Sequence, residues 1–374
     1  MIEAVTWTAD GMRLIDQRQL PHREDYLHID TVDGLVDAVS TLAVRGAPAL
    51  GAAGGLGVVV ALRQAAREGW DQEHLRGQIS RIRDARPTAV NLAWGVDRVT
   101  AAAFGGTGHA GSARHTRATT TEPPTPDPQP AAAPPVALDP EVALAEALAI
   151  IEEDRAANRA LSRHGADWIL QHTGQPGRVR VLTHCNTGAL ATTGWGTAYG
   201  IIHQLHDQDR LGLVYADETR PLLQGARLTS WELTHDGIDH VVQADGAAAS
   251  TILRGLVDVA VVGADRIAAN GDTANKVGSL AVALACRRAG IPFVVAAPAS
   301  TVDLATPSGQ AITIEDRDEE EILAWGGVRT APQQARGFNP AFDVTPNDLI
   351  AAIVTEHGAA PAGPGWFSFA GPTF

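Results

Sequence analysis

Hydrophobic positions in the first third of the chain recur with the spacing of α-helices. The segment VDGLVDAVSTLAVRG, residues 32–46, places apolar residues three and four apart, and ALGAAGGLGVVVALRQAAREG, residues 49–69, continues the pattern beyond Pro48. The second segment is crowded with Gly and Ala, which lowers intrinsic helix stability but permits close approach of backbones. The pattern predicts helices from about Thr31 to Trp94.

Composition changes abruptly between about Ala103 and Pro140, where Gly, Ser, Thr, Ala and Pro dominate. Such a segment cannot bury a core and predicts a disordered insertion over residues 103–140. The sequence EVALAEALAIIEEDRAANRALSRHGADWIL then predicts a long helix, because Pro140 stands at its start and acidic residues fill its first half. We expect a mainly helical domain over residues 1–140 and a connecting helix over residues 141–177.

Beyond residue 177 the pattern alternates short β-branched runs with helical segments. The runs VRVLTH, RLGLVYADE, DHVVQAD, VDVAVVGAD and PFVVAAP are separated by stretches of helical periodicity. This alternation is typical of βαβ units and predicts an α/β domain over residues 178–358 with a parallel, doubly wound sheet, followed by an irregular tail over residues 359–374. Ligands gather at the carboxyl ends of such strands. The polar residues at these ends are Cys185, Glu218 and Asp265.

Length and charge restrict the class of protein. The 374 residues suit two domains that each bury a core. The formal net charge of −14 argues against a nucleic-acid or anionic-membrane surface, since such partners need a basic face. The start MIEAVTWTADGMRLIDQ lacks a signal-peptide pattern, and no uninterrupted apolar stretch reaches the length of a membrane span. We expect a cytoplasmic enzyme that binds neither membrane nor nucleic acid.

The two cysteines have different surroundings, and neither has the spacing of a metal ligand, so we expect no metal. Cys185 stands at a predicted strand end in THCNTGALATTGWGTAYG, where small residues leave backbone N–H groups free to stabilise an anion. On spacing alone, a buried and inert Cys185 is an equal alternative. Cys286 lies in the apolar helix LAVALACRRAG and is expected to be a packed core residue.

Two carboxylates occur in VVGADRIAANGD. Asp265 ends a predicted strand beside apolar side chains, a setting that removes water from a carboxyl group and suits it to general-acid chemistry near neutral pH. Asp272 lies just before the helix expected to start near Asn275, and it is the better candidate for capping that helix.

Several cationic and amide side chains are candidates for binding a phosphate ester. Asn275 and Lys276 are expected at a helix start, where N–H groups and the helix dipole favour phosphate. Arg45 in RGAP and Arg86 in RPTAVNL supply guanidinium groups that hold phosphate in a forked geometry. Gln224 in ETRPLLQGARLT is a candidate donor to sugar hydroxyls. A single residue of these kinds is more often a solvated surface residue, so only the combination indicates a site.

A dinucleotide site is a competing interpretation of GWGTAYG, whose glycines are followed about twenty residues later by Asp217 and Glu218. The third glycine comes one position too late, and the first lies well beyond the strand end. The match is therefore imperfect, and we expect no nicotinamide cofactor.

Six segments together resemble one enzyme family. They are RGAPALG, RPTAVNLAW, THCNTGALAT, DETRPLLQGARLT, GADRIAANGDTANKVGS and AVALACRRAGIPFVVAAPAST. They are spread in order over residues 45–301, most of the length of the chain, and are similar to the S-methyl-5-thioribose-1-phosphate isomerase family of methionine salvage. The resemblance implies a helical N-terminal domain, a Rossmann-like C-terminal domain, a homodimer and a pocket between the domains that binds a sugar phosphate without a cofactor.

The resemblance also implies residue roles. Cys185 and Asp265 match the family's catalytic pair, which would convert 5-methylthioribose 1-phosphate to its 1-ketose by acid-assisted ring opening and transfer of hydrogen from C2 to C1. The positions that match the family's substrate contacts are Arg45, Gly46, Ala47, Arg86, Gln224, Asn275 and Lys276.

The wider superfamily leaves alternatives, because one fold hosts several functions. It includes regulatory subunits of the eukaryotic nucleotide-exchange initiation factor, which need no catalytic pair, and a ribose-1,5-bisphosphate isomerase. The segments RPTAVNL and ETRPLLQGARLT favour the methylthioribose branch. 5-Deoxyribose 1-phosphate is a candidate additional substrate, because an apolar pocket discriminates weakly between such analogues. A regulatory or partner-binding role for the insertion is a further alternative.

Overall fold

A small antiparallel sheet and a helical layer form the N-terminal part of the chain. The computed structural model describes residues 2–86, 90–104, 139–174 and 176–367. The sheet, in the order β1-β2-β3, consists of β1 (Val5–Thr8), β2 (Gly11–Ile15) and β3 (Tyr26–Ile29). The helices are α1 (Val32–Ser40), α2 (Ala47–Glu68), α3 (Gln72–Arg83) and α4 (Val90–Ala103). The sequence pattern gave no indication of the three strands.

The glycines of α2 allow it to pack closely against α4. A Cβ atom built on Gly95 of α4 would lie 2.0 Å from the carbonyl oxygen of Gly51 in α2. A methyl group on Gly95 would therefore hold the two helices apart. Helix α2 is long and apolar enough to pass for a membrane span by composition, but 89% of its most apolar window is buried inside the protein, as in a core helix.

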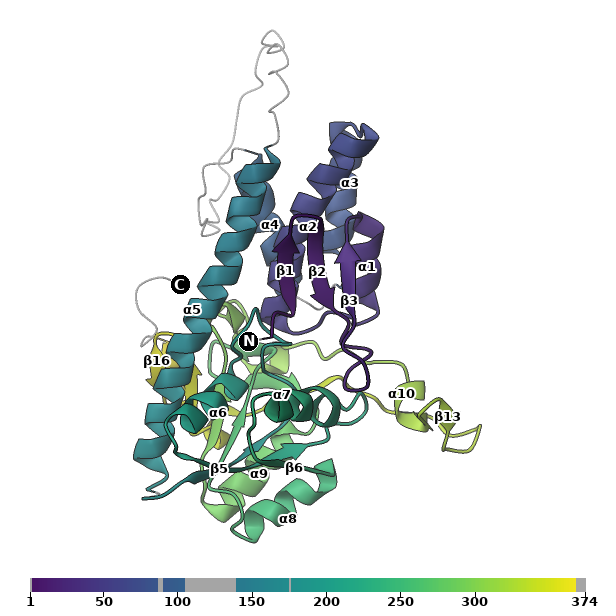
Figure 1. The fold of residues 1–374 in the computed structure, drawn as a ribbon. Helices are drawn as coiled ribbons and strands as arrows, with labels where there is room; N and C mark the ends of the chain where they lie inside the picture. Colours follow the sequence, from purple (N-terminus) through teal and green to yellow (C-terminus); the bar gives the residue numbers. More distant parts are fainter. Residues whose placement is uncertain (1, 87–89, 105–138, 175, 368–374) are drawn as a thin grey trace, which may run out of the picture.

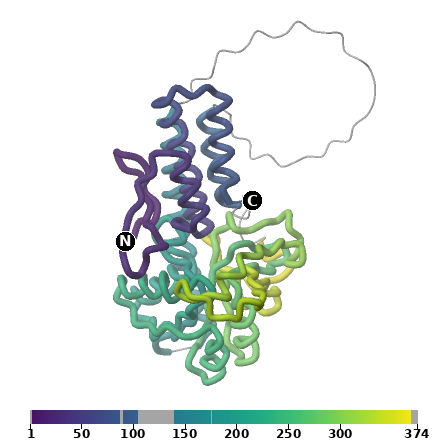
Figure 2. The backbone as a smooth tube through the Cα atoms, turned by 90° about the vertical axis from the view of Figure 1, so that its right-hand side faces the viewer, coloured from purple at the N-terminus to yellow at the C-terminus, as the bar shows by residue number. Residues whose placement is uncertain are grey.

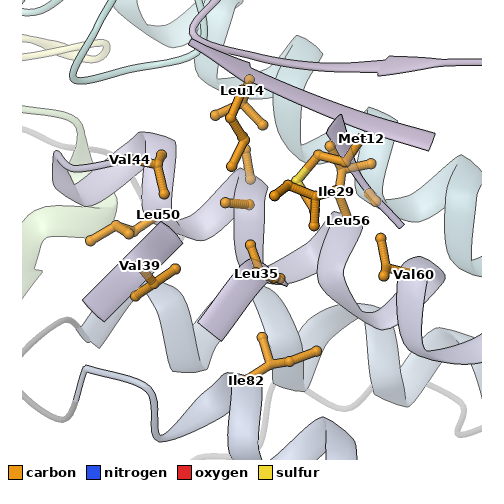
Figure 3. Packing of buried hydrophobic residues seen from close by; sticks show 14 of the residues in the cluster. Met12, Leu14, Ile29, Leu35, Val39, Val44, Leu50, Leu56, Val60 and Ile82 are labelled. Carbon is orange, nitrogen blue, oxygen red and sulfur yellow. The ribbon is translucent and has the colours of Figure 1, made fainter. Parts of the chain in front are cut away.

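One hydrophobic core fills the space between the small sheet and the helices. Figure 3 shows Met12 and Leu14 of β2 facing Leu35 of α1 and Leu56 of α2, with Ile82 of α3 on the far side. All five side chains are fully buried. Burial of such side chains stabilises a fold by about 1.5–3 kcal/mol each, so this part of the chain has a core of its own.

A single long helix, α5 (Pro140–His172), connects the two parts of the molecule. Its first half contributes Ala147 and Ile150 to the N-terminal core, and its second half contributes Leu161 and Ile169 to the core below the large sheet. Figures 1 and 2 show this helix running along both parts. The parts are therefore joined by continuous packing as well as by the chain.

The C-terminal part is built on a seven-stranded sheet in the order β16-β15-β10-β7-β4-β5-β6. Every pairing is parallel except that of β15 with β16. The strands are β4 (Val179–Thr183), β5 (Leu211–Asp217), β6 (His240–Gln243), β7 (Val259–Val262), β10 (Phe293–Ala296), β15 (Ala352–Thr355) and β16 (Gly358–Ala360). This confirms the predicted α/β class and the mainly parallel sheet.

Helices cover both faces of this sheet. The second half of α5 and α6 (Ala198–Asp207) pack on one face, whereas α8 (Ala248–Leu253) and α9 (Ser279–Ala289) pack on the other (Figure 1). The remaining helices are α7 (Ser230–His235), which continues a π-helical turn over Gly225–Thr229, and α10 (Glu320–Leu323). Hydrophobic clusters on both faces explain why the central strands are apolar along their whole length.

A second, four-stranded sheet follows β7 and borders the functional site. It has the order β11-β8-β9-β14 and consists of β8 (Arg266–Ala268), β9 (Thr273–Lys276), β11 (Val302–Asp303) and β14 (Phe342–Thr345). The short hairpin strands β12 (Ala324–Trp325) and β13 (Val328–Arg329) complete the list.

Two local predictions around β9 are wrong. Asn275 and Lys276 end a strand, and the helix that follows begins only at Ser279. Asp272 does not cap this helix, because its carboxylate accepts hydrogen bonds from the N–H groups of Gly309 and Asn347. The amides at the helix start instead donate to Asp343 of β14. The strand pairing with β14 overrode the local propensity for a helix.

Two predicted segments lie largely outside the described residues. These are the insertion, of which residues 105–138 are not described, and the end of the tail, residues 368–374.

Candidate active site

The candidate site lies where the chain reverses the direction in which it adds strands to the large sheet. Counted along the chain, the parallel strands stand in the order 3-2-1-4-5-6, and the reversal falls between β4 and β7. The loops after two such strands diverge to opposite sides and leave a crevice at their carboxyl ends. Cys185 follows β4 and Asp265 follows β7. The topology therefore brings the two candidate catalytic groups to one crevice.

All nine site residues predicted from the sequence line the same pocket, which encloses about 750 Å³ with its mouth included. The C-terminal part contributes Cys185, Gln224, Asp265, Asn275 and Lys276, and the N-terminal part contributes Arg45, Gly46, Ala47 and Arg86. The pocket thus lies between the two parts of the chain. Residues 80 positions or more apart meet there, which no local pattern could reveal.

Cys185 is held in an unusual backbone conformation. Its φ angle is +68°, a region that residues other than Gly seldom adopt. Its N–H donates to Oγ1 of Thr219 at 2.9 Å, and its carbonyl oxygen accepts from Oγ1 of Thr229 at 2.7 Å. The side chain is 7% exposed. Strained conformations of this kind persist where the surroundings fix them, and here they fix the direction of the thiol.

A buried imidazole supports the loop that carries Cys185. His184 Nδ1 lies 3.0 Å from a carboxylate oxygen of Asp217, and Nε2 lies 2.8 Å from the carbonyl oxygen of Val277. Burial alone would lower the pKa of His184, but the hydrogen bond and the charge of Asp217 outweigh it and raise the pKa. Since Val277 follows Lys276, this imidazole ties the thiol loop to the end of β9.

His184, Asp217 and Asp245 form a group close enough to ligate a metal ion. The atoms of this group are already used: Asp217 accepts from Gln243 as well as from His184, and Asp245 accepts from the N–H groups of Thr219 and Arg220. A hydrogen-bonded network that holds a proton accounts for this arrangement. Asp217 is also fully buried, so a ribose hydroxyl in solution cannot reach its carboxylate, which argues against the dinucleotide interpretation.

Asp265 stands at the wall of the pocket. Its backbone N–H donates to the carbonyl oxygen of Ala274 at 2.9 Å, which anchors it to β9. Asp265 is an exposed residue, because water reaches its carboxyl group through the pocket, although protein crowds it on the other sides. The crowding removes part of the surrounding water and raises the pKa of Asp265, against the opposing charges of Lys276, Arg45 and Arg86. A ligand that displaces the pocket water completes the burial and favours the protonated acid further.

Lys276 brings a nearly buried ammonium group to the pocket. It is 8% exposed, and its Nζ lies 4.6 Å from the ring centre of Phe342. Burial lowers the pKa of Lys276, while negative charge on Cys185 and Asp265 opposes that shift. The neighbouring Asn275 donates to Oγ of Ser279. An anionic ligand would offset the cost of burying this cation.

Three arginines complete the positive lining. Arg45 donates from Nη2 to the carbonyl oxygen of Asn186 at 2.9 Å, and its Nη1 has no hydrogen-bond partner among the described residues. Arg86 lies 3.9 Å from Glu315, and burial lowers its pKa. Arg317 lies 3.3 Å from the same carboxylate. Sequence reasoning missed Arg317, which follows no strand end or glycine-rich motif.

The first turn of α2 also faces the pocket. Gly46 precedes the helix with φ +95°, and Ala47 is its first residue. A Cβ atom on Gly46 would lie 2.2 Å from the carbonyl oxygen of Ala191, so only glycine fits beside the loop after β4. The helix dipole that was expected at Asn275 is therefore supplied by α2, whose positive end favours a phosphate.

Other lining residues were not predicted either. Asn186 and Thr187 immediately follow Cys185, and Phe342 comes from β14. The adjacency of Asn186 to a candidate nucleophile was the one signal in the sequence. Cys286, by contrast, is fully buried in α9, and burial raises its pKa to about 12, as suits an inert core thiol.

Comparison with known proteins gives one family. The Initiation factor 2 subunit family matches residues 43–362. A probable bifunctional methylthioribose-1-phosphate isomerase/methylthioribulose-1-phosphate dehydratase of Nocardia farcinica is 47% identical over 95% of this chain, which spans only 58% of that protein. The methylthioribose-1-phosphate isomerase of Xanthomonas euvesicatoria is 46% identical over 96% of this chain and 92% of its own length.

Solved structures agree with these relatives. The 5-methylthioribose 1-phosphate isomerase of Pyrococcus horikoshii superposes with a TM-score of 0.82 at 34% identity, over 99% of this chain and 95% of that one. The structure titled translation initiation factor eIF-2B, subunit delta, from A. fulgidus superposes with a TM-score of 0.79 at 36% identity, over 98% of each chain.

Proposed function

We propose that this chain, which belongs to the Initiation factor 2 subunit family, is an aldose–ketose isomerase that converts 5-methylthioribose 1-phosphate to 5-methylthioribulose 1-phosphate in methionine salvage. Relatives 46–47% identical over 95% or more of the chain carry that activity in their names. The observation that carries the proposal is the single pocket in which Cys185 and Asp265 meet a set of cations. Isomerisation of a sugar phosphate needs the pair of proton-transfer groups, and binding of its phosphate needs the cations.

The chemistry of the substrate explains why an acid is needed. Phosphate on the anomeric oxygen prevents the ring from opening to a free aldehyde, so the ring oxygen must be protonated as its bond to C1 breaks. Asp265, whose pKa is raised by the protein that crowds it, is the donor of this proton. Cys185 removes the proton from C2, which gives a C1=C2 enol with the phosphate on O1 and the hydroxyl on C2. The thiol then returns a proton to C1, while the C2 hydroxyl loses its proton to the Asp265 carboxylate, and the C2 carbonyl of the ketose forms.

A hydride shift from C2 to C1 is the main alternative for the hydrogen transfer. In that case Cys185 and Asp265 handle only hydroxyl and ring-oxygen protons. Turnover in D₂O distinguishes the two routes, because deuterium at C1 of the product rejects a pure hydride shift. Complete retention of a label from C2 would instead weaken the proton-transfer route.

The cations bind the phosphate and orient the sugar. Arg45 and Arg86 approach from the N-terminal part, Lys276 approaches from β9, and the positive end of α2 faces the same space. Charge-assisted hydrogen bonds of this kind fix the ester at the carboxyl ends of β4 and β7. The ring oxygen and C2 are thereby held between the acid and the thiol.

A non-catalytic regulatory module is the second candidate, favoured by the similarity to the structure titled as an initiation-factor subunit. A module of this kind has no need of a strained thiol opposite a carboxyl group in a cationic pocket. The related substrates 5-deoxyribose 1-phosphate and ribose 1,5-bisphosphate differ from 5-methylthioribose 1-phosphate at C5. The relative kcat/KM values for the three esters therefore show which of them the enzyme prefers.

We further propose that the enzyme is a cytoplasmic homodimer that binds neither nucleic acid nor membrane. Apolar side chains that are 40–56% exposed support an interface at one end of the C-terminal part, where β6, α8 and α9 lie (Figure 1). These side chains are Val241, Val242, Leu253 and Leu284. Sedimentation equilibrium tests this directly: a mass near twice 39.1 kDa is expected, and a monomer would contradict it.

A single assay tests the activity. The purified protein is incubated with a chelator and 5-methylthioribose 1-phosphate, and the product is followed by ³¹P and ¹³C NMR. The ketose signal is expected at a rate proportional to enzyme concentration. Tight binding of the sugar phosphate without turnover would favour the regulatory module instead.

A further inference from the structure

The residue after the candidate thiol has a side-chain amide whose orientation is fixed. Asn186 Nδ2 lies within hydrogen-bond distance of two oxygens, Oγ1 of Thr229 at 3.3 Å and Oε2 of Glu232. The Thr229 hydroxyl donates its one proton to the carbonyl oxygen of Cys185, so it can only accept a hydrogen bond from Asn186. The NH₂ group of Asn186 must therefore face this side.

Glu232 is built into the protein interior for this contact. It is fully buried in α7, with one carboxylate oxygen accepting from Asn186 and the other from the N–H of Leu190 at 3.0 Å. A Cβ atom on Gly188 would lie 2.3 Å from the carboxylate, so the thiol loop is shaped around it. Both neighbours are donors, and an ionised carboxylate accepts from both, whereas a protonated one brings an O–H donor that faces another donor.

The other end of the Asn186 amide has no hydrogen-bond partner in the described part of the chain. Its Oδ1 is buried from water, on the pocket side as elsewhere, and accepts no hydrogen bond from the described residues, while Asn186 as a residue belongs to the pocket lining. The same holds for Oε1 of Gln224, while Nη1 of Arg45 is a shielded donor without an acceptor. Buried polar atoms are costly unless satisfied, so a ligand rich in hydroxyl groups is their natural complement.

We propose that Glu232 is a positioning residue, whose ionised carboxylate holds the Asn186 amide so that Oδ1 faces the pocket and accepts a hydrogen bond from a hydroxyl of the bound sugar. This inference rests on the proposed isomerase activity and adds a substrate contact to it. A protonated Glu232 would present an O–H donor to Asn186. The amide would then turn, and its NH₂ group would face the sugar in place of the acceptor.

The charged groups around Glu232 determine the pH at which its carboxylate becomes protonated. Burial raises the pKa of Glu232 to about 7, and the negative charge of Asp236 adds to this rise. The N–H of Leu190, the amide of Asn186 and the positive charge of Arg45 act in the opposite direction. The phenol of Tyr199 also faces this region and donates to Asp236 at 2.7 Å. Recognition of the sugar hydroxyl should therefore weaken as the pH falls through neutrality.

A double-mutant cycle tests the proposal with 5-methylthioribose 1-phosphate as substrate. Asn186→Leu and Glu232→Gln should each raise KM about tenfold, with a smaller effect on kcat, because the contact is already made in the bound substrate. The double variant should lose no more than Asn186→Leu alone, since Glu232 acts through Asn186. Thr234→Val, on the exposed side of the same helix, is the control and should leave KM unchanged.

The outcomes separate cleanly. Losses that multiply in the double variant, or an unchanged KM in Asn186→Leu, would overturn the proposal, the latter because an internal water would then satisfy Oδ1. If Glu232→Gln fails to fold, the pH dependence of KM in the unaltered enzyme and in Asn186→Leu decides: a rise of KM below pH 7 is expected only in the former. Absence of turnover by the unaltered enzyme would instead refute the isomerase activity and this inference with it.

Discussion

Replacement of Gly46 by Ala should damage both the fold and the pocket, and Gly69→Ala provides a matched comparison. Both residues have positive φ angles, +95° for Gly46 and +71° for Gly69, and they flank the same helix, α2. Gly69 adopts the left-handed helical region, and a Cβ atom there meets nothing within 4 Å. The comparison therefore separates backbone strain from steric overlap.

The expected magnitudes differ several-fold. An alanine in the left-handed region costs about 1–2 kcal/mol, partly offset by the lower entropy of the unfolded chain, so Gly69→Ala should lose about 1 kcal/mol of unfolding free energy. At Gly46 the Cβ atom would lie 2.2 Å from the carbonyl oxygen and 2.5 Å from the Cα atom of Ala191. The loop must move, and the hydrogen bond from Ala49 to Ala191 is lost with it. We expect a loss of about 4 kcal/mol or more.

Urea unfolding followed by the fluorescence of the eight tryptophans measures these losses, and kcat/KM reports the pocket. Gly46→Ala should unfold at a clearly lower urea concentration than Gly69→Ala, and it should also lose more than tenfold in kcat/KM, because Ala191 lines the pocket. Gly69→Ala should keep its activity. Equal stabilities and equal activities of the two variants would refute the argument that the loop after β4 and the start of α2 are in contact.

Three further predictions follow from the charges of the site. Lys276→Met should raise KM for the phosphate ester about tenfold without lowering thermal stability, because the cost of burying the ammonium outweighs its attraction to Cys185 and Asp265 until a phosphate binds; a lower Tm would contradict this. The kcat of the unaltered enzyme should fall as the pH rises through the raised pKa of Asp265, because the proton donor is lost; a kcat that climbs steadily with pH would exclude Asp265 as the acid. The raised pKa of Glu232 means that the folded state binds a proton between about pH 4.5 and 7 that the unfolded state does not. As the pH rises across that window, this residue therefore lowers the free energy of unfolding by on the order of 3 kcal/mol. Glu232→Gln should flatten the slope of unfolding free energy against pH, and an unchanged slope would contradict the argument from burial.

The sequence allowed the sheet to be predicted well because its signal is local. Continuous apolar runs such as VDVAVVGAD follow from burial on both faces, and their spacing reflects the helices between them. The small N-terminal sheet was missed because its strands, such as VTWT and YLHI, lack the continuous apolar runs that mark the equally short central strands of the large sheet. Lys276 was assigned to a helix start because its pairing partner, Phe342 of β14, is distant in the chain.

The sequence indicated which residues belong to the candidate site but not how they contact one another. Motif resemblance pointed to the nine lining residues, but neither Arg317 nor the link from Glu232 to Asn186 has a local signature. Glu232 is an ordinary acidic residue in LTSWELTHDG, and nothing nearby indicates that it is fully buried. Its partners come from a loop more than forty positions earlier, so only the folded chain reveals them.

The most direct test of the account is the kcat of Asp265→Asn with 5-methylthioribose 1-phosphate, measured alongside the affinity for the same ester. The amide keeps the shape of the side chain but cannot donate a proton to the ring oxygen. We expect kcat to fall by a factor on the order of a hundred or more while binding changes only a few-fold. Turnover close to that of the unaltered enzyme would contradict the assignment of Asp265 as the acid opposite Cys185.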